Sequence, residues 1–340
     1  MIWTTMERIS ASAIACGWVI CALLAAPGAA HGQVEFTAEG NERISIRIDG
    51  RPFSDFYIGK DFGKPFLAPL RSANGLIVTR KFPMESVEAE SRDHPHHRGL
   101  WIGYGNVNGV NFWENEIGVP NTDRETPKQQ GRIVLLQVSG TKPGKKSGTI
   151  AATFAWRKPD GGDLMEERRV MTFYSDPETR TVDVDATFTA KTTVQFADTK
   201  EGFFAIRVAD SMAGKNGGMM TNSEGAQTEK QVWGQRADWV DYDGTVEGQK
   251  VGIVVFDDPQ NKGRPPRWHV RDYGLMTANP FALHDYMPGR GLSGEWVVPV
   301  GGEATFRYRV YAHAGDALEA DVAGRYADWA WPVRARLAPA

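Results

Sequence analysis

Apolar and polar residues alternate along most of the chain from about residue 33 onward. The segment 180–189 (RTVDVDATFT) shows this most clearly, because Asp or Thr separates its apolar residues. Period-two alternation is typical of a strand with one buried face and one solvent-exposed face, as in antiparallel sheets. Similar runs, bounded by Gly, Pro, Asp or Asn, occupy residues 43–48, 132–138, 149–156, 167–174, 202–208, 251–256 and 304–312.

One segment, 316–329, has helical spacing instead, because its apolar residues recur every three or four positions. About 16 to 20 strand segments follow one another without intervening helices, which excludes folds built from βαβ units. A propeller would repeat every ~40–50 residues, and the chain shows no such repeat. We therefore predict an all-β fold: a large antiparallel two-sheet β-sandwich, a single domain over residues 33–340, with one C-terminal helix.

Residues 1–32 have the layout of a signal peptide. Arg8 precedes an apolar run at 11–26, and Ala30 and Gly32 suit the positions before a cleavage site at Gln33. An uncleaved membrane anchor is the alternative, but the run is shorter than the ~20 residues that span a bilayer. We expect a cleaved peptide and a periplasmic or extracellular protein.

Composition removes several classes of function. Among 340 residues, 39 Lys and Arg face 42 Asp and Glu, and this net charge of -3 argues against a nucleic-acid partner. The two cysteines, Cys16 and Cys21, both lie in the predicted signal peptide. The mature chain would then have no disulfide, thiolate nucleophile or cysteine metal ligand. It also has no later apolar run long enough to span a membrane.

The densest polar segment is 91–101 (SRDHPHHRGLW), which holds three histidines within four positions. If the segment is extended, His94, His96 and Arg98 share one face and His97 points the other way. Two imidazoles on one face can bind a metal ion, or one can act as acid or base beside a charged neighbour. A polar loop with hydrogen-bonded histidines is the alternative.

Three further clusters are candidates for binding or catalysis. Each also has an ordinary structural interpretation, as a solvated turn with an ion pair or as core indoles. The clusters contain Asp198, Lys200 and Glu201; Trp233, Arg236, Asp238 and Asp241; and His269, Arg271, Asn279 and His284.

Several motifs together resemble the bacterial secreted family labelled "methane oxygenase PmoA". The resemblance extends over about residues 45–313, and its motifs are HPHHRGLW at 94–101, NGVNFW at 108–113, DTKEG at 198–202, Trp233-Gly234, Trp268-His269 and NPF at 279–281. It implies a galactose-mutarotase-like supersandwich and an association with polysaccharide-degrading bacteria. The oxygenase label fits poorly, because a methane monooxygenase subunit of that name is an integral membrane protein.

Three functions remain open. The first is a carbohydrate-active enzyme, a hydrolase, lyase or epimerase, that uses His and Glu as acid and base without a cofactor. The second is a non-catalytic sugar-binding sandwich. The third is an oxygenase with a divalent metal ion on His94, His96 and Glu201. The partner in the first two is a carbohydrate, and the sequence specifies no oligomeric state.

For the enzyme we expect His94, His97, Arg98, Glu201 and His269 to lie around one cavity on one sheet face. The catalytic residues would be His94, His97, Glu201 and His269, with Glu201 kept ionised as a base by Lys200. Trp113 would stack on the sugar. The substrate-binding set is Arg98, Asn108, Trp113, Lys200, Arg236, Asp238, Arg271, Asn279 and His284.

The signal-peptide prediction is tested by the mass of exported protein. We expect an intact mass that corresponds to a chain starting near Gln33. Exported protein that retains residues 1–32 would contradict the prediction.

Overall fold

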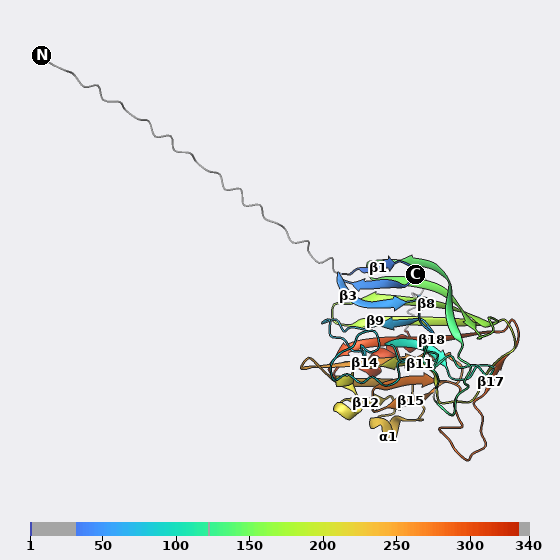
Figure 1. Ribbon diagram of the computed structural model, residues 1–340. Coiled ribbons are helices and arrows are strands. Elements are labelled where there is room, and N and C mark those ends of the chain that lie inside the picture. Colours follow the sequence, from blue (N-terminus) through green and yellow to red (C-terminus); the bar gives the residue numbers. More distant parts are fainter. Residues whose placement is uncertain (2–31, 122, 333–340) are drawn as a thin grey trace, which may run out of the picture.

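A computed structural model describes Met1, residues 32–121 and residues 123–332 of the chain (Figure 1). Almost all of the predicted signal peptide and residues 333–340 lie outside this described part. Two antiparallel sheets of eight strands each make up the fold, with a short two-stranded sheet beside them. The predicted all-β, two-sheet architecture is confirmed. None of the helices in the described ranges is long and apolar enough to cross a membrane.

The first sheet carries the residues discussed below. In spatial order its strands are β1 (Val34–Glu39), β2 (Arg43–Ile48), β3 (Arg51–Tyr57), β4 (Phe66–Ala68), β5 (Leu100–Tyr104), β11 (Gly202–Arg207), β16 (Leu275–Asn279) and β15 (Arg267–Arg271). Strands distant in sequence are therefore neighbours here: β5 pairs with β11, and β11 with β16.

The second sheet follows the chain more closely. Its order is β12 (Met219–Asn222), β13 (Trp239–Val246), β14 (Gln249–Asp257), β18 (Glu303–Ala314), β9 (Arg180–Ala190), β8 (Asp163–Ser175), β7 (Ser147–Arg157) and β6 (Arg132–Lys142). The small sheet pairs β10 (Val194–Phe196) with β17 (Trp296–Val298). The short helical elements are η1 (Asp210–Met212), η2 (Gly214–Asn216) and α1 (Thr228–Val232).

The alternating pattern places the main core between the two sheets. In β9, every second side chain is buried, as the strict alternation of the sequence predicts. Phe154 of the second sheet and Ile102 and Phe204 of the first belong to this core. The fold is thus held by the two inner faces, which leaves each outer face free to carry other features.

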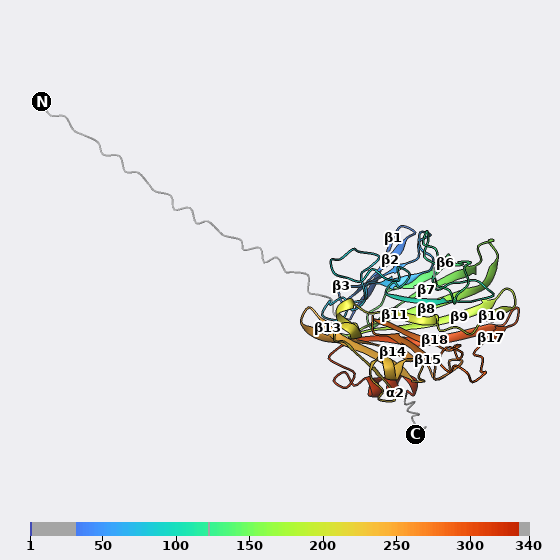
Figure 2. The same cartoon turned by 60° about the horizontal axis from the view of Figure 1, so that its bottom comes forward.

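The C-terminal helix α2 (Val322–Ala330) covers part of the outer face of the second sheet, as Figure 2 shows. Val322 and Tyr326 pack on Trp239 and Phe256 there. The helix is shorter than the predicted 316–329 because Asp321 has a left-handed backbone (φ 48°), which an α-helix cannot include. The helix nevertheless packs against the sandwich as expected.

One ion pair lies inside the main core. Glu167 and Arg169 are successive inward-facing residues of β8, and Arg169 Nε donates to Glu167 Oε1 at 2.6 Å. Trp156 Nε1 donates to the other oxygen, Oε2, at 2.9 Å. Both charged side chains are almost completely shielded from solvent, at 0% and 4% exposure. The pair therefore depends on charge compensation rather than on water.

We predict that Glu167→Gln lowers the free energy of unfolding by about 3–5 kcal/mol, because it leaves the Arg169 guanidinium buried without a counter-charge. Asp163→Asn is the control on the same strand, since its ion pair with Arg157 is exposed and should contribute at most ~1 kcal/mol. Denaturant unfolding measures both. Equal effects of the two substitutions would contradict the prediction.

Candidate functional site

The outer face of the first sheet carries a continuous row of functional candidates. Strand register places Trp101 of β5 opposite Ala205, Ala205 opposite Thr277, and Thr277 opposite His269. Directly opposed residues of an antiparallel sheet share a face, and Trp101 and Ala205 belong to a cluster outside the main core. His269 therefore lies on the same outer face as Trp101. By the same register, Arg207, Leu275 and Arg271 form the next row.

The histidine segment forms a turn above this face rather than an extended strand. The backbone N–H of His97 donates to the carbonyl of His94 at 3.0 Å, and His94 has a left-handed φ of 42°. The separation of His97 from His94 and His96 that an extended segment would give is absent, because the turn gathers all three rings. The ring centroids of His94 and His97 are 4.7 Å apart and nearly parallel, and His96 is 4.4 Å from His97.

Two of these imidazoles lie within a stack of four rings. Tyr273 stacks on His94 at 5.0 Å, His94 stacks on His97, and His97 stacks on Trp101 at 5.1 Å. The stack runs from Tyr273 through the half-exposed His94 and the buried His97 to Trp101 on the sheet. His97 is 1% exposed, so His94 is the imidazole of the stack that faces solvent.

Asp93 anchors the turn through two buried arginines. Its Oδ1 accepts Arg80 Nη1 at 2.7 Å and Arg207 Nη2 at 2.8 Å, and it also lies 3.0 Å from His94 Nδ1. Arg80 also donates to the carbonyls of His94 and His97. Burial alone would raise the pKa of the Asp93 carboxyl, but His94 and Arg207 hold it well below its usual value. Asp93 therefore stays ionised and fixes the turn.

These contacts define which ring nitrogens carry protons. A guanidinium can only donate, so His97 Nδ1, 3.3 Å from Arg207 Nη1, accepts and the proton sits on Nε2. Burial holds the pKa of His97 well below its usual value, which keeps the ring neutral. A carboxylate can only accept, so the 3.0 Å contact with Asp93, although it lacks hydrogen-bond alignment, favours the His94 tautomer that carries its proton on Nδ1. That atom is buried although 40% of the side chain is exposed, and Nε2 therefore lies on the exposed edge.

A pocket of about 380 Å³ opens beside His94. Its lining residues are His94, Pro95, His96, Glu114, Glu116, Val119, Pro120, Asn121 and Asp123. Glu116 is paired with Arg98, whose Nε donates to Oε2 at 3.0 Å. Glu114 accepts the Thr126 hydroxyl at 2.7 Å. The pocket is thus formed between the histidine turn and the loop 105–131, and its wall is polar.

Glu201 precedes β11 and lies close to this pocket. A Cβ added at Gly105 would lie 2.8 Å from Glu201 Cβ and 3.3 Å from Thr126 Cγ2, so the glycine leaves room for the glutamate beside Thr126. Burial, with smaller contributions from Glu114 and Asp123 of the pocket wall, raises the pKa of Glu201 to about 8. The expectation that Lys200 keeps Glu201 ionised is wrong, because burial outweighs it. Glu201 is a proton donor at neutral pH.

His269 and Asn279 hold the backbone that carries Glu201. His269 Nδ1 donates to the Lys200 carbonyl at 3.1 Å, and Asn279 Nδ2 donates to the carbonyls of Thr199 and Lys200 at 2.9 and 3.0 Å. Burial lowers the pKa of His269 to about 3, so the ring is neutral and cannot supply a proton near pH 7. His269 is thus positioned to orient Glu201, whereas the sequence suggested a catalytic histidine.

Three predicted binding residues border the site but already have protein partners. Arg98 pairs with Glu116, Lys200 Nζ pairs with Glu125, and Arg271 lies 3.3 Å from Glu229. Trp113 also lies here, but it is fully buried against Trp101. Its predicted stacking on a sugar is therefore wrong as the side chain stands.

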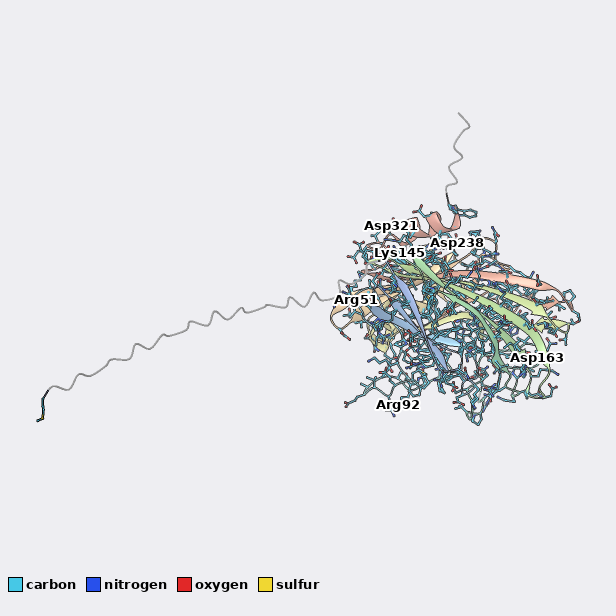
Figure 3. The ribbon with its side chains drawn as sticks, turned by 90° about the horizontal axis from the view of Figure 1, so that it is seen from above. Arg51, Arg92, Lys145, Asp163, Asp238 and Asp321 are labelled. Atoms are coloured by element: carbon cyan, nitrogen blue, oxygen red, sulfur yellow. The ribbon has the colours of Figure 1, made fainter. Side chains whose placement is uncertain are left out.

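Four other predicted binding residues are not part of the site. Asn108 closes a turn by donating to the Thr193 carbonyl, and Arg236 donates to the carbonyls of Gly263 and Pro265. Asp238 pairs with Arg264 and lies near Asp321 on the α2 side, whereas Arg92, beside the histidine turn, lies on the opposite side (Figure 3). His284 is 78% exposed on the loop 280–295.

The donor set for a metal ion is not formed. Among the described residues, no three His, Cys, Asp or Glu side chains are grouped so that they could hold a metal. His94 Nδ1 is directed at Asp93, and the ring lies between Tyr273 and His97. The alternative site of His94, His96 and Glu201 is therefore not supported by the arrangement of these side chains.

Several residues of the site were missed from the sequence. No local pattern singles out Arg80, Arg207 and Tyr273, and only the fold brings them to Asp93 and His94. Lys64 is also buried here, with Nζ donating to the Trp113 carbonyl at 2.7 Å and Asn115 Oδ1 at 2.8 Å. Burial lowers its pKa to about 7. Asp93 was the one recognisable signal, because it adjoins the histidines.

The raised pKa of Glu201 predicts a pH dependence of stability. The folded state binds this proton more tightly than the unfolded chain, whose carboxyl has a pKa near 4.5. Relative to Glu201→Gln, the wild-type free energy of unfolding should therefore fall as the pH rises from about 5 to about 9. Denaturant unfolding across this range measures it, with the exposed Glu303→Gln as control. Parallel curves for wild type and Glu201→Gln would contradict the assignment.

Comparisons with known proteins give a family and several distant structural likenesses. No curated protein matches the chain by sequence. Similar solved structures include a galactose mutarotase-like protein from Clostridium acetobutylicum, with 10% identity, TM-score 0.40, and coverage of 83% of this chain and 98% of that one. An alpha-galactosidase from Lactobacillus brevis has 9% identity, TM-score 0.39 and coverage of 83% and 40%. A putative aldose 1-epimerase from Escherichia coli K12 has 10% identity, TM-score 0.32 and coverage of 84% and 100%.

The family match covers most of the chain. Residues 43–328 match the model of a family of unknown function, DUF6807. This range contains every strand of the site and all of its side chains. The chain belongs to the DUF6807 family.

Proposed function

We propose that the protein is a secreted carbohydrate-active enzyme that acts on glycans or glycosides by acid–base chemistry, as a hydrolase, lyase or epimerase. One observation carries the proposal: Glu201, whose carboxyl is held protonated by burial, lies close to the pocket that His94 lines, and the Asp93 carboxylate lies 3.0 Å from His94 Nδ1. Tyr273 stacks on His94, and burial raises its pKa, with a smaller contribution from the nearby Glu201. The signal-peptide pattern of residues 1–32 supports secretion.

The two side chains are suited to opposite roles in proton transfer. Glu201, with a pKa of about 8, can donate a proton to an oxygen that leaves or opens. His94 Nε2, on the exposed edge of its ring, can accept a proton from a substrate C–H or O–H, or from a water. Asp93 would then stabilise the imidazolium, because its carboxylate lies 3.0 Å from Nδ1.

The pocket suits a sugar in size and in polarity. Its volume of about 380 Å³ lies within the range for small-molecule sites. Carboxylates and imidazoles line it, and these groups hydrogen-bond to hydroxyls. A binding module would need neither a carboxyl held protonated nor an imidazole beside a carboxylate that two buried arginines hold, and both features favour catalysis. The metal-dependent oxygenase lacks the grouped donor side chains described above.

We predict that Glu201→Gln and His94→Gln each lower turnover by roughly 100-fold or more, the scale for losing a general acid or base. The assay incubates wild type with a glycan panel and follows released sugar, unsaturated product and change of configuration by NMR. His284→Gln is the matched control, because His284 is exposed outside the site. It should retain wild-type activity.

Asp93→Asn separates orientation from proton transfer. It should lower turnover and increase the Nε2–H tautomer of His94 in ¹⁵N NMR spectra, since the amide no longer holds the Nδ1 proton. Full activity of both Glu201→Gln and His94→Gln would refute the assignment. Binding of a glycan without any turnover by wild type would instead establish the sugar-binding alternative.

A further inference from the structure

We infer that the pocket beside His94 selects uncharged, hydroxyl-bearing sugars and rejects uronic-acid or sulfated ones. This inference rests on the proposed function for the choice of a carbohydrate, but its observations concern only the pocket wall. Three of the nine lining residues are acids, Glu114, Glu116 and Asp123, and none of the nine is Lys or Arg. Anionic sugars are ordinarily recognised by Arg or Lys donors, which this wall does not present.

The cations nearby are engaged away from the pocket. Arg98 is paired with Glu116 through two nitrogens, Nε and Nη2, which donate to the two carboxylate oxygens. Lys128 Nζ donates to the backbone carbonyl of Asp123, and Lys64 Nζ is bound to a carbonyl and an amide oxygen beneath the wall.

The two arginines of the Asp93 anchor are equally unavailable. Arg80 and Arg207 have side chains with 0% exposure. A substrate anion would therefore have to break an existing ion pair to gain a cation.

The free positions on the wall are hydrogen-bond acceptors. Both donors to Glu114, from Asn111 and Thr126, reach Oε2, which leaves Oε1 without a donor among the described residues. Asp123 accepts the Glu125 N–H through Oδ1, and its Oδ2 is likewise without a donor there. Hydroxyl groups supply the matching donors, whereas a carboxylate or sulfate would supply only further acceptors and a repelling charge.

His96 is an independent sign that a ligand belongs here. It lines the pocket and is 7% exposed, yet neither ring nitrogen has a hydrogen-bond partner in the described part of the chain. Burial keeps its pKa well below the usual value, so the neutral ring offers one donor and one acceptor. A hydroxyl, which both donates and accepts, can satisfy either nitrogen. Neither His96 nitrogen is among the fully enclosed polar atoms of the described residues, so a ligand in the pocket can reach them.

The test compares binding of matched oligosaccharides by calorimetry at pH 7. The pairs are β-1,4-linked tetramers of glucose and of glucuronic acid, and of mannose and of mannuronic acid. We expect the uncharged member of at least one pair to bind at least ~10-fold more tightly than its uronic counterpart. Equal or tighter binding of the uronic member, or binding of no tetramer at millimolar concentration, would overturn the inference.

Variants locate the preference at the wall. Glu114→Gln combined with Asp123→Asn should reduce the preference by about 10-fold, because it removes two charges at nearly constant shape. The control combines Glu35→Gln on β1 with Glu303→Gln on β18, which removes the same two negative charges outside the pocket. It should leave the preference unchanged. His96→Phe should weaken binding of the uncharged tetramer by about 10-fold.

An unchanged preference in the Glu114 and Asp123 variant, or equal effects of the two double variants, would also overturn the inference. Its failure is distinguishable from failure of the proposed function. A preference for uncharged tetramers without turnover would retain the inference and refute the enzyme. Turnover of uronic-acid substrates would support the enzyme and refute the inference that the pocket rejects charged sugars.

Discussion

The site depends on one carboxylate that two buried guanidiniums share. Arg80 comes from the loop 69–99, Arg207 ends β11, and Asp93 binds both through a single oxygen. Neither arginine side chain has any exposed surface, so loss of Asp93 would leave two buried positive charges without the carboxylate that bonds to both. The position of His94 and His97 follows from this constraint, because Arg80 holds their carbonyls and Arg207 holds the His97 ring.

Burial is the largest influence on the protonation states of Glu201 and His269. Removing water disfavours whichever form is charged. It raises the pKa of the Glu201 carboxyl to about 8 and lowers that of the His269 imidazole to about 3. The same environment therefore yields a protonated acid and a neutral histidine without any dedicated charge partner for either. The half-exposed His94 differs, because it combines access to the pocket with an ionised carboxylate beside it.

The sequence predicted what depends on local periodicity and failed where distant segments meet. Alternation specified β9 and the two-sheet core, since side-chain direction in a strand repeats every two residues. The same rule misplaced His97, because the 91–98 segment is held as a turn by Arg80, which no local pattern connects to it. The charge of Lys200 beside Glu201 also misled, since burial is not visible in a sequence. Aromatic neighbours made Asp238 a candidate for sugar binding. It lies next to β13 of the second sheet, whereas the site is on the first sheet.

The location of the site on the first sheet follows from how the two outer faces are covered. On the second sheet, α2 packs directly on Trp239 and Phe256 and closes that part of the face with apolar contacts. On the first sheet, long loops rather than a helix cover the face, namely residues 69–99, 105–131 and 280–295. Loop backbones bring polar groups that must be bonded, and here Asp93, Arg80 and Asn279 meet that need. Because Arg80 bonds to the carbonyl of His94 and Asn279 to that of Lys200, the bonds that hold the loops in place also fix the positions of His94 and Glu201.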